Sequence, residues 1–79
     1  MTDVRPFLTQ RQQQCLRLAA AGLDHRAIGD RIGLAFGTVR IHLTEARKAL
    51  GAANTAHAVG LGVHYGIVGA EHLHSEERP

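Results

Sequence analysis

Several stretches of the chain place apolar residues at the spacing of an α-helix. In the clearest, residues 36–50, Val39, Leu43, Ala46 and Leu50 recur at intervals of three or four residues, with polar or charged residues between most of them. That spacing puts the four apolar side chains on one side of a helix. We therefore predict an amphipathic helix with one side against a core and the other facing outward.

Residues that cap helices divide the first third of the chain. Thr9 and Gln12 match a capping box, in which each side chain bonds the other residue's backbone, and predict the start of a first helix. Gly22 supplies the glycine that commonly follows the end of a helix. Asp24 is a favourable N-cap for a second helix, which we expect to run to about Ile32.

Similar signals bound the remaining helices. The third is expected to begin near Ala35 or Phe36 and to end at Gly51. Asn54 can cap a fourth helix, for which Gly66 is the expected stop. The fourth helix contains two internal glycines, each of which costs about 1 kcal/mol relative to alanine, so it needs support from packing or from a second subunit.

These elements predict one all-α domain, which we place at residues 8–68. It follows an N-terminal arm, 1–7, and precedes a polar, flexible tail, 69–79. A chain of 79 residues can form one small core. The opening letters MTDVRP are typical of a natural start, so we expect a complete chain of bacterial or phage origin.

The second and third helices have the spacing of a helix-turn-helix. Gly29 lies four residues before Gly33, and Val39 lies six residues after it. In this motif the first residue lets the helices cross closely, the second makes the turn, and the third fills the wedge between the helices. Residues 36–50 are then the recognition helix, and the sequence predicts a module that binds duplex DNA.

Basic charge gathers on this motif. Residues 5–51 carry eight Arg and Lys against three Asp and Glu, a surplus of five, whereas the whole chain has a net charge of +2. A basic face is the electrostatic footprint of nucleic-acid binding, although a charge run by itself is as often an ordinary solvated surface. The low aromatic content, 4%, argues against a stacking platform for single strands.

The polar side of the recognition helix supplies the candidate DNA contacts. Arg40 can pair with O6 and N7 of guanine, Ile41 can contact a thymine methyl group, and Thr44 lies on the same side as these base-reading candidates. Thr38 can donate its hydroxyl to a phosphate or serve only as a local cap. Basic residues further along the helix tend to bind phosphate, which makes Arg47 and Lys48 candidates for that role.

With these residues the chain resembles the LuxR-type (GerE-like) helix-turn-helix family of bacterial transcription regulators. The matching pieces, between residues 7 and 68, are LTQRQQQCLRLAAAGL, AIGDRIGL, GTVRIHL, KALG and AHAV. The resemblance implies a four-helix LuxR-type bundle whose third helix reads the major groove. It also implies that Arg26 contacts phosphate, and that Thr38, Arg40 and His42 occupy family positions. Ala35 and Phe36 depart from the family's usual Ser-Glu, which predicts a weaker cap and a more apolar first turn.

The fourth helix is the candidate dimer contact, as the resemblance also implies. Ala56 and Gly60 are small enough for close backbone approach, and Val59 and Val63 add apolar contact four residues apart. The alternative is that both valines pack only inward. We expect a weak homodimer completed on a two-fold DNA site, with half-sites about 10 bp apart.

Two other functions remain open at this point. The piece TVRIHLTEARKAL is also similar to region four of bacterial sigma factors, which would add RNA polymerase as a partner, although a fourth helix favours the LuxR-type interpretation. The chain could instead be a small adaptor that binds another regulator. Salt-dependent binding to duplex DNA separates the adaptor from both DNA-binding alternatives.

Other chemistry is weakly supported. Cys15 lies among apolar residues, which predicts a buried, unreactive thiol in a reducing cytoplasm. Glu71, His72 and His74 form EHLH in the predicted tail, a weak metal signal, so we expect surface histidines, no metal and no cofactor. No apolar run is long enough to cross a bilayer, and no catalytic motif is visible, so we expect neither a membrane protein nor an enzyme.

Overall fold

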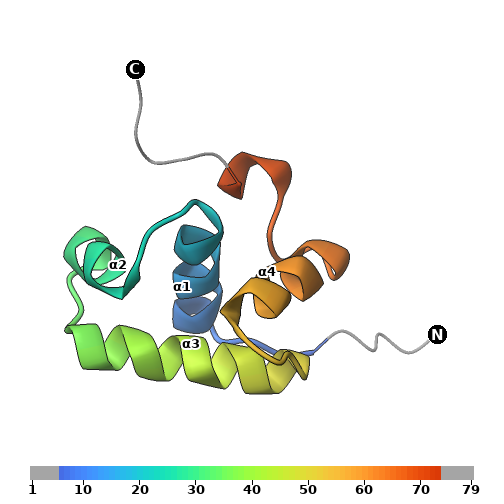
Figure 1. The fold of residues 1–79 in the computed structure, drawn as a ribbon, viewed down its shortest axis with the longest axis horizontal. Helices are drawn as coiled ribbons and strands as arrows, with labels where there is room; N and C mark the ends of the chain where they lie inside the picture. Colours follow the sequence, from blue (N-terminus) through green and yellow to red (C-terminus); the bar gives the residue numbers. More distant parts are fainter. Residues whose placement is uncertain (1–5, 74–79) are drawn as a thin grey trace.

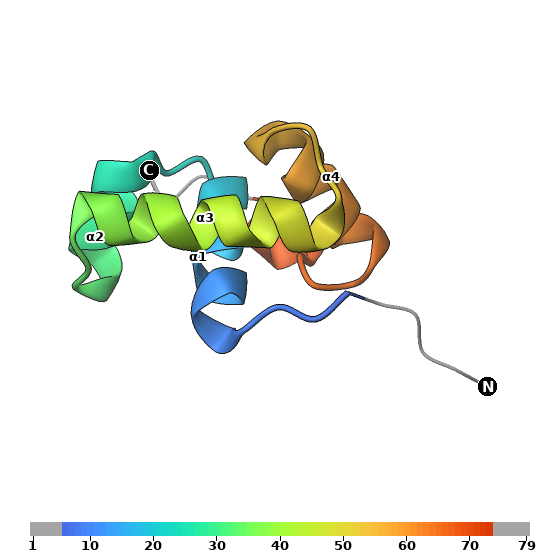
Figure 2. The ribbon, with the colours of Figure 1, turned by 90° about the horizontal axis from the view of Figure 1, so that it is seen from below.

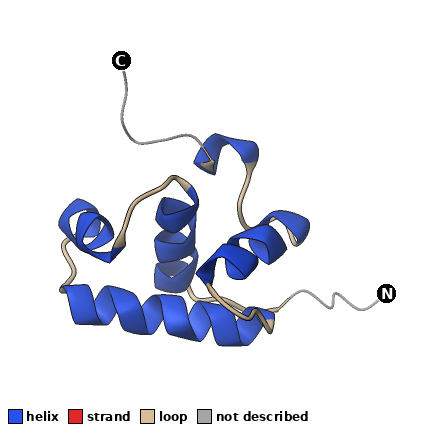
Figure 3. Cartoon of the chain, in the orientation of Figure 1, coloured by secondary structure: helices blue, strands red, loops and turns tan. Residues whose placement is uncertain are grey.

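The computed structural model describes residues 6–73, which form helices and no strand (Figure 3). The elements are α1 (Gln10–Ala20), α2 (His25–Ile32), α3 (Phe36–Leu50), α4 (Thr55–His64) and a short 3-10 helix, η1 (Ala70–His72). α3 lies along one side of the molecule, α1 stands over its middle, and α2 and α4 lie to either side of α1 (Figure 1). The predicted all-α, four-helix fold is confirmed.

The predicted helix starts are also present. The Thr9 hydroxyl accepts from the Gln12 amide at 3.1 Å and the Gln12 side chain accepts from the Thr9 amide at 3.0 Å, which completes the capping box. Asp24 caps α2 by accepting from the Ala27 amide at 2.9 Å. Asn54 caps α4 in the same way. These caps depend on local spacing, which explains why the sequence predicted them.

The turn between α2 and α3 has the geometry that the spacing predicted. Gly33 adopts φ 74°, a left-handed conformation that side chains disfavour. A Cβ at Gly29 would collide with the carbonyl oxygen of Leu34 and lie 3.6 Å from Cγ2 of Val39. Val39 is completely buried. The small size of Gly29 is therefore required by the turn backbone first, and by the wedge residue second.

A single core joins all four α-helices. Its largest completely enclosed side chains include Leu16 of α1, Ile28 of α2 and Val39 of α3. The rest of the predicted apolar stripe of α3 is buried too: Leu43, Ala46 and Leu50. Burial of this stripe fixes how α3 is rotated about its axis, and so fixes which of its side chains face outward.

α4 approaches α1 closely at Gly62. A Cβ there would lie 2.9 Å from Cγ2 of Val68 and 3.1 Å from Cδ2 of Leu16, both of which are fully buried. At Gly60, by contrast, a Cβ would meet nothing within 4 Å. The two glycines of α4 thus differ, since one faces the core and the other faces outward. The packing at Gly62 is the support that this glycine-containing helix needs.

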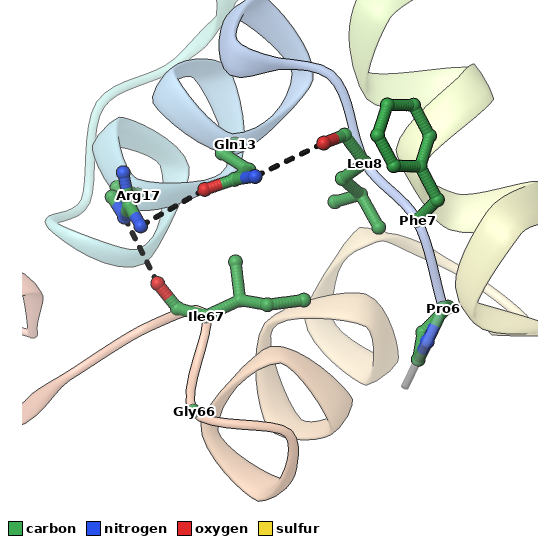
Figure 4. A pocket seen from close by; sticks show the side chains of 7 residues that line it. All are labelled: Pro6, Phe7, Leu8, Gln13, Arg17, Gly66 and Ile67. Carbon is green, nitrogen blue, oxygen red and sulfur yellow. Dashed lines mark hydrogen bonds between the residues drawn. The ribbon is translucent and has the colours of Figure 1, made fainter. Parts of the chain in front are cut away.

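Hydrogen bonds from α1 tie the two ends of the described chain together (Figure 4). Arg17 Nε donates to the carbonyl oxygen of Ile67 at 2.9 Å, and Arg17 Nη2 donates to Oε1 of Gln13 at 3.1 Å. Gln13 Nε2 in turn donates to the carbonyl oxygen of Leu8 at 3.0 Å. We call Leu8, Gln13, Arg17 and Ile67 the brace. It borders a cavity of about 440 Å³.

The end of the domain differs from the tail expected from composition. The described chain continues past Val68 into η1, which lies against α1. His72 Nδ1 accepts from the Gly69 amide at 2.8 Å and so closes this short turn. Of the predicted arm, 1–7, and tail, 69–79, the segments 1–5 and 74–79 lie outside the described residues.

Candidate nucleic-acid interface

Within residues 6–73 the outer side of α3 is uncovered along its length, because the other helices lie on its opposite side (Figure 2). Its exposed residues are Phe36, Gly37, Arg40, Ile41, Glu45, Lys48 and Ala49. Ile41 is 61% exposed and Phe36 53% exposed, so this side of α3 presents apolar as well as charged groups to a ligand. A helix held by its apolar stripe, with both charged and apolar groups facing outward, has the form of a recognition helix.

The three predicted base-reading residues lie together. Arg40, Ile41 and Thr44 line one shallow depression of about 220 Å³, and Glu45 completes its lining. Arg40, Ile41 and Glu45 are exposed, whereas Thr44 is half-buried. The arrangement combines a bidentate donor, an apolar surface, a hydroxyl and a carboxylate within reach of one short stretch of a ligand.

Glu45 had no place in the sequence prediction. It is the only acidic residue of α3, and the contacts predicted for this helix were basic, apolar or hydroxyl side chains. The signal was present in the sequence, since Glu45 lies four positions after Ile41 and therefore on the same side of the helix.

The predicted phosphate-binding residues divide into two groups. Arg26, near the start of α2, and Lys48, in the last turn of α3, are exposed, and Thr38 is half-buried in the first turn of α3. Arg47 is also half-buried, and its Nη1 donates to the carbonyl oxygen of Ala52 at 3.0 Å. The side chain of Arg47 therefore closes the loop after α3 as well as carrying charge.

The first turn of α3 is apolar and has no side-chain cap. Ala35 occupies the N-cap position, and no side chain accepts a capping hydrogen bond there. Phe36 lies beside the ring of His25 of α2, with 5.5 Å between ring centroids. The weaker cap and more apolar first turn that the sequence predicted are thus both present, and Phe36 contacts the ring of His25 in α2.

The outward side of α4 carries most of the predicted dimer residues. Ala56, Gly60 and Val63 are exposed, and Val63 is 46% exposed. Val59 is half-buried and packs against the core. The alternative in which both valines pack only inward therefore applies to Val59 and not to Val63. Whether a second subunit covers the exposed stripe stays a prediction.

Cys15 and the EHLH residues were the other candidates for chemistry. Cys15 is completely buried; burial raises the pKa of its thiol above 9.0, and the charge of Arg11 lowers that pKa by a smaller amount. Within residues 6–73 no group of three or more metal-binding side chains comes together. Of the EHLH motif, Glu71 and His72 are described, 3.8 Å apart, and His74 lies outside the described residues.

None of the helices in residues 6–73 combines the length and the hydropathy needed to cross a membrane.

The family model and the curated relative that match this chain both belong to bacterial regulatory proteins. The chain matches the family model GerE, described as bacterial regulatory proteins of the luxR family, over residues 6–61. Over 62 residues it is 32% identical to the transcriptional activator protein ExpR of Dickeya dadantii (strain 3937). That match covers 78% of this chain and 25% of ExpR, so the chain spans a quarter of the length of this relative.

The fold is similar to a solved structure of the transcription factor GerE. The TM-score is 0.75 at 21% sequence identity, and the match covers 78% of this chain and 92% of that chain.

Proposed function

This chain belongs to the luxR family of bacterial regulatory proteins, and we propose that it is a DNA-binding transcription regulator that reads a specific duplex sequence with α3 in the major groove. The observation that carries the proposal is the free outer side of α3, on which Arg40, Ile41 and Thr44 line one depression. The cytoplasm, where a bacterial chromosome lies, is the compartment that goes with this function.

Three side chains have the chemistry to read bases. The guanidinium of Arg40 presents parallel donors that fit O6 and N7 of guanine. Ile41 is exposed and apolar, so its burial against a thymine methyl group gains affinity that no other base offers. Thr44 has a hydroxyl that can donate or accept.

Phosphate contacts position α3 without reading sequence. Arg26 is exposed near the start of α2, Lys48 is exposed in the last turn of α3, and Thr38 offers a hydroxyl at the start of α3. Arg47 is proposed in the same role through its remaining N–H groups, since only Nη1 is bonded to Ala52. Contacts spread in this way fix the register of the helix on the duplex.

We further propose that two copies meet through α4 on a two-fold site. Ala56, Gly60 and Val63 offer an exposed stripe of small and apolar residues, and Val59 borders it on the core side. So small an apolar surface supports a weak dimer that DNA completes rather than a permanent one. Two recognition helices would then meet half-sites about 10 bp apart.

Selection of bound sequences from random duplex DNA tests the proposal. We expect an enriched site with two-fold symmetry, bound more weakly as salt increases, because each neutralised phosphate contributes about −0.9 to the slope of log K against log salt. Binding without enrichment of any sequence would contradict specific reading. Failure to bind duplex DNA would favour the adaptor function.

Two substitutions of Arg40 test whether its side chain reads a base. Arg40→Ala should lose about 1–3 kcal/mol on the selected site and relax the preference at one base pair. Arg40→Lys keeps the charge but not the paired donors, so it should also relax that preference while retaining most non-specific affinity. Full specificity in Arg40→Lys would remove Arg40 from the base-reading set.

A further inference from the structure

The carboxylate of Glu45 is an unusual group for a DNA-facing helix. It is exposed, it lines the same depression as Arg40, Ile41 and Thr44, and it lies one helical turn after Ile41. Within residues 6–73 its side chain makes no ion pair or hydrogen bond. The negative charge is therefore available to whatever α3 contacts.

Against a duplex such a charge weakens binding unless it finds a donor. The phosphates repel it, and contact with a groove removes water that would otherwise solvate it. An ionised carboxylate only accepts hydrogen bonds. In the major groove, the bases offer two donors, the N4 amine of cytosine and the N6 amine of adenine.

Cytosine suits the carboxylate better than adenine does. Adenine presents the acceptor N7 beside its amine, an edge that fits a side-chain amide, which both donates and accepts. Guanine and thymine present only acceptors or a methyl group, which a carboxylate cannot satisfy. Of the four bases, cytosine alone offers a donor without an adjacent ring-nitrogen acceptor.

We propose that Glu45 is a specificity-determining residue that accepts a hydrogen bond from the N4 amine of a cytosine; the proposal rests on the proposed placement of α3 in the major groove. Arg40 and Glu45 leave the helix in different directions because they are five residues apart, so they read different base pairs. The depression between them then holds one guanine edge and one cytosine edge within a half-site.

The test begins with selection from random duplex DNA, using the parent chain, Glu45→Gln and Glu45→Ala. The parent should enrich cytosine at one position of each half-site. Glu45→Gln should shift that position toward adenine, because glutamine matches the N6 and N7 edge, and Glu45→Ala should lose the preference. Glu71→Gln is the matched control, since it removes an exposed carboxylate from η1, on the side of the molecule away from α3.

A second test removes only the amine that is proposed to donate to Glu45. In the selected duplex, the cytosine is replaced by the deoxyriboside of pyrimidin-2-one, which lacks the amino group. We expect the parent to bind this duplex about tenfold more weakly, as for loss of a hydrogen bond to a charged group. Glu45→Ala should bind the two duplexes equally, and circular dichroism should show that both Glu45 variants keep the helical content of the parent.

The outcomes separate the two proposals. If Glu45→Gln binds all duplexes more tightly by one factor and its selected site is unchanged, Glu45 only repels phosphate and this inference is overturned. If Arg40→Ala also leaves the selected site unchanged, the placement of α3 is wrong as well. If Arg40→Ala alters the base preference at one position of the selected site and the Glu45 variants alter none, only the inference about Glu45 is contradicted.

Discussion

Arg47 and Lys48 are neighbours in the chain, yet their side chains leave α3 in different directions. Lys48 extends outward, whereas Arg47 bends over the end of the helix and bonds the carbonyl oxygen of Ala52. A helix advances by about 100° per residue, so one step along the chain separates a solvent-facing position from one beside the core. Removal of Arg47 and removal of Lys48 should therefore have different effects on stability and on DNA binding, although both side chains carry one positive charge.

Lys48→Ala should change DNA binding and leave stability unaltered. We expect weaker binding to every duplex and a salt slope flatter by about 0.9, because one phosphate contact is lost. Arg47→Ala should lower the free energy of unfolding by about 1 kcal/mol, since it removes a half-buried hydrogen bond. Urea unfolding and binding titrations at several salt concentrations measure both effects. Equal stability losses in the two variants would contradict this division.

Cys15 links stability to alkaline pH. Its pKa is raised in the folded chain, chiefly by burial, so above the ordinary value of 9.0 the unfolded chain loses the thiol proton first. The contribution of the neutral thiol to stability is complete below that pH and declines as pH rises toward the folded pKa. The stability advantage of the parent over Cys15→Ala should therefore shrink between pH 8 and pH 10. An advantage that stays constant in urea unfolding at these pH values would argue against this linkage.

At the scale of elements, the α2–α3 pair and α4 each contain one glycine that close packing requires and one that it does not. Gly29 and Gly62 are needed because other groups occupy the space where a side chain would lie. Gly37 and Gly60 have open space and are needed for neither packing nor backbone conformation. The sequence showed the importance of Gly29 through the spacing of the motif. It could not separate Gly62 from Gly60, because the groups that lie against Gly62 belong to Val68 and Leu16, both outside the helix.

Gly29→Ala should strongly destabilise the domain. The new Cβ meets the backbone carbonyl of Leu34, which cannot move aside without opening the turn, and we expect a loss of about 1–3 kcal/mol. Gly37→Ala, in the first turns of α3, is the matched control, and it should be neutral or stabilising by up to about 1 kcal/mol. Thermal unfolding of the two variants decides the matter. Similar midpoints for both would contradict the steric argument.

The exposed stripe of α4, formed by Ala56, Gly60 and Val63, can be tested as a dimer contact. Val63→Glu should abolish cooperative binding to a two-fold site, because two carboxylates would face each other across the contact, and should leave half-site binding nearly intact. Val59→Glu is the comparison, since Val59 packs against the core and its replacement should destabilise the fold itself. Binding curves on full sites and half-sites separate these effects. Equal loss on both sites in a folded Val63→Glu chain would rule out this stripe as the dimer contact.

At the scale of the molecule, α3 forms one side, and the two ends of the described chain are joined by the brace. The sequence predicted the four helices, their caps and the turn, because each depends on residues only a few positions apart. It could not predict the bond from Arg17 to Ile67, or that from Arg47 to Ala52, since the acceptors are backbone carbonyls that any residue supplies. The same limit applies to η1, whose composition resembles that of a loop.

The separation of Arg17 and Ile67, 50 positions in the chain, also sets an order of events during synthesis. A ribosome adds roughly 5–20 residues each second, so roughly 3–10 s pass between the two residues. Helices form in about a microsecond, and α2 and α3 can meet as soon as both have been made. The side of Leu16 that lies close to Gly62 cannot be covered by α4 until that helix has been made. The nascent chain therefore carries the α2–α3 pair before α4 and Val68 complete the core, and in that interval it is most exposed to aggregation.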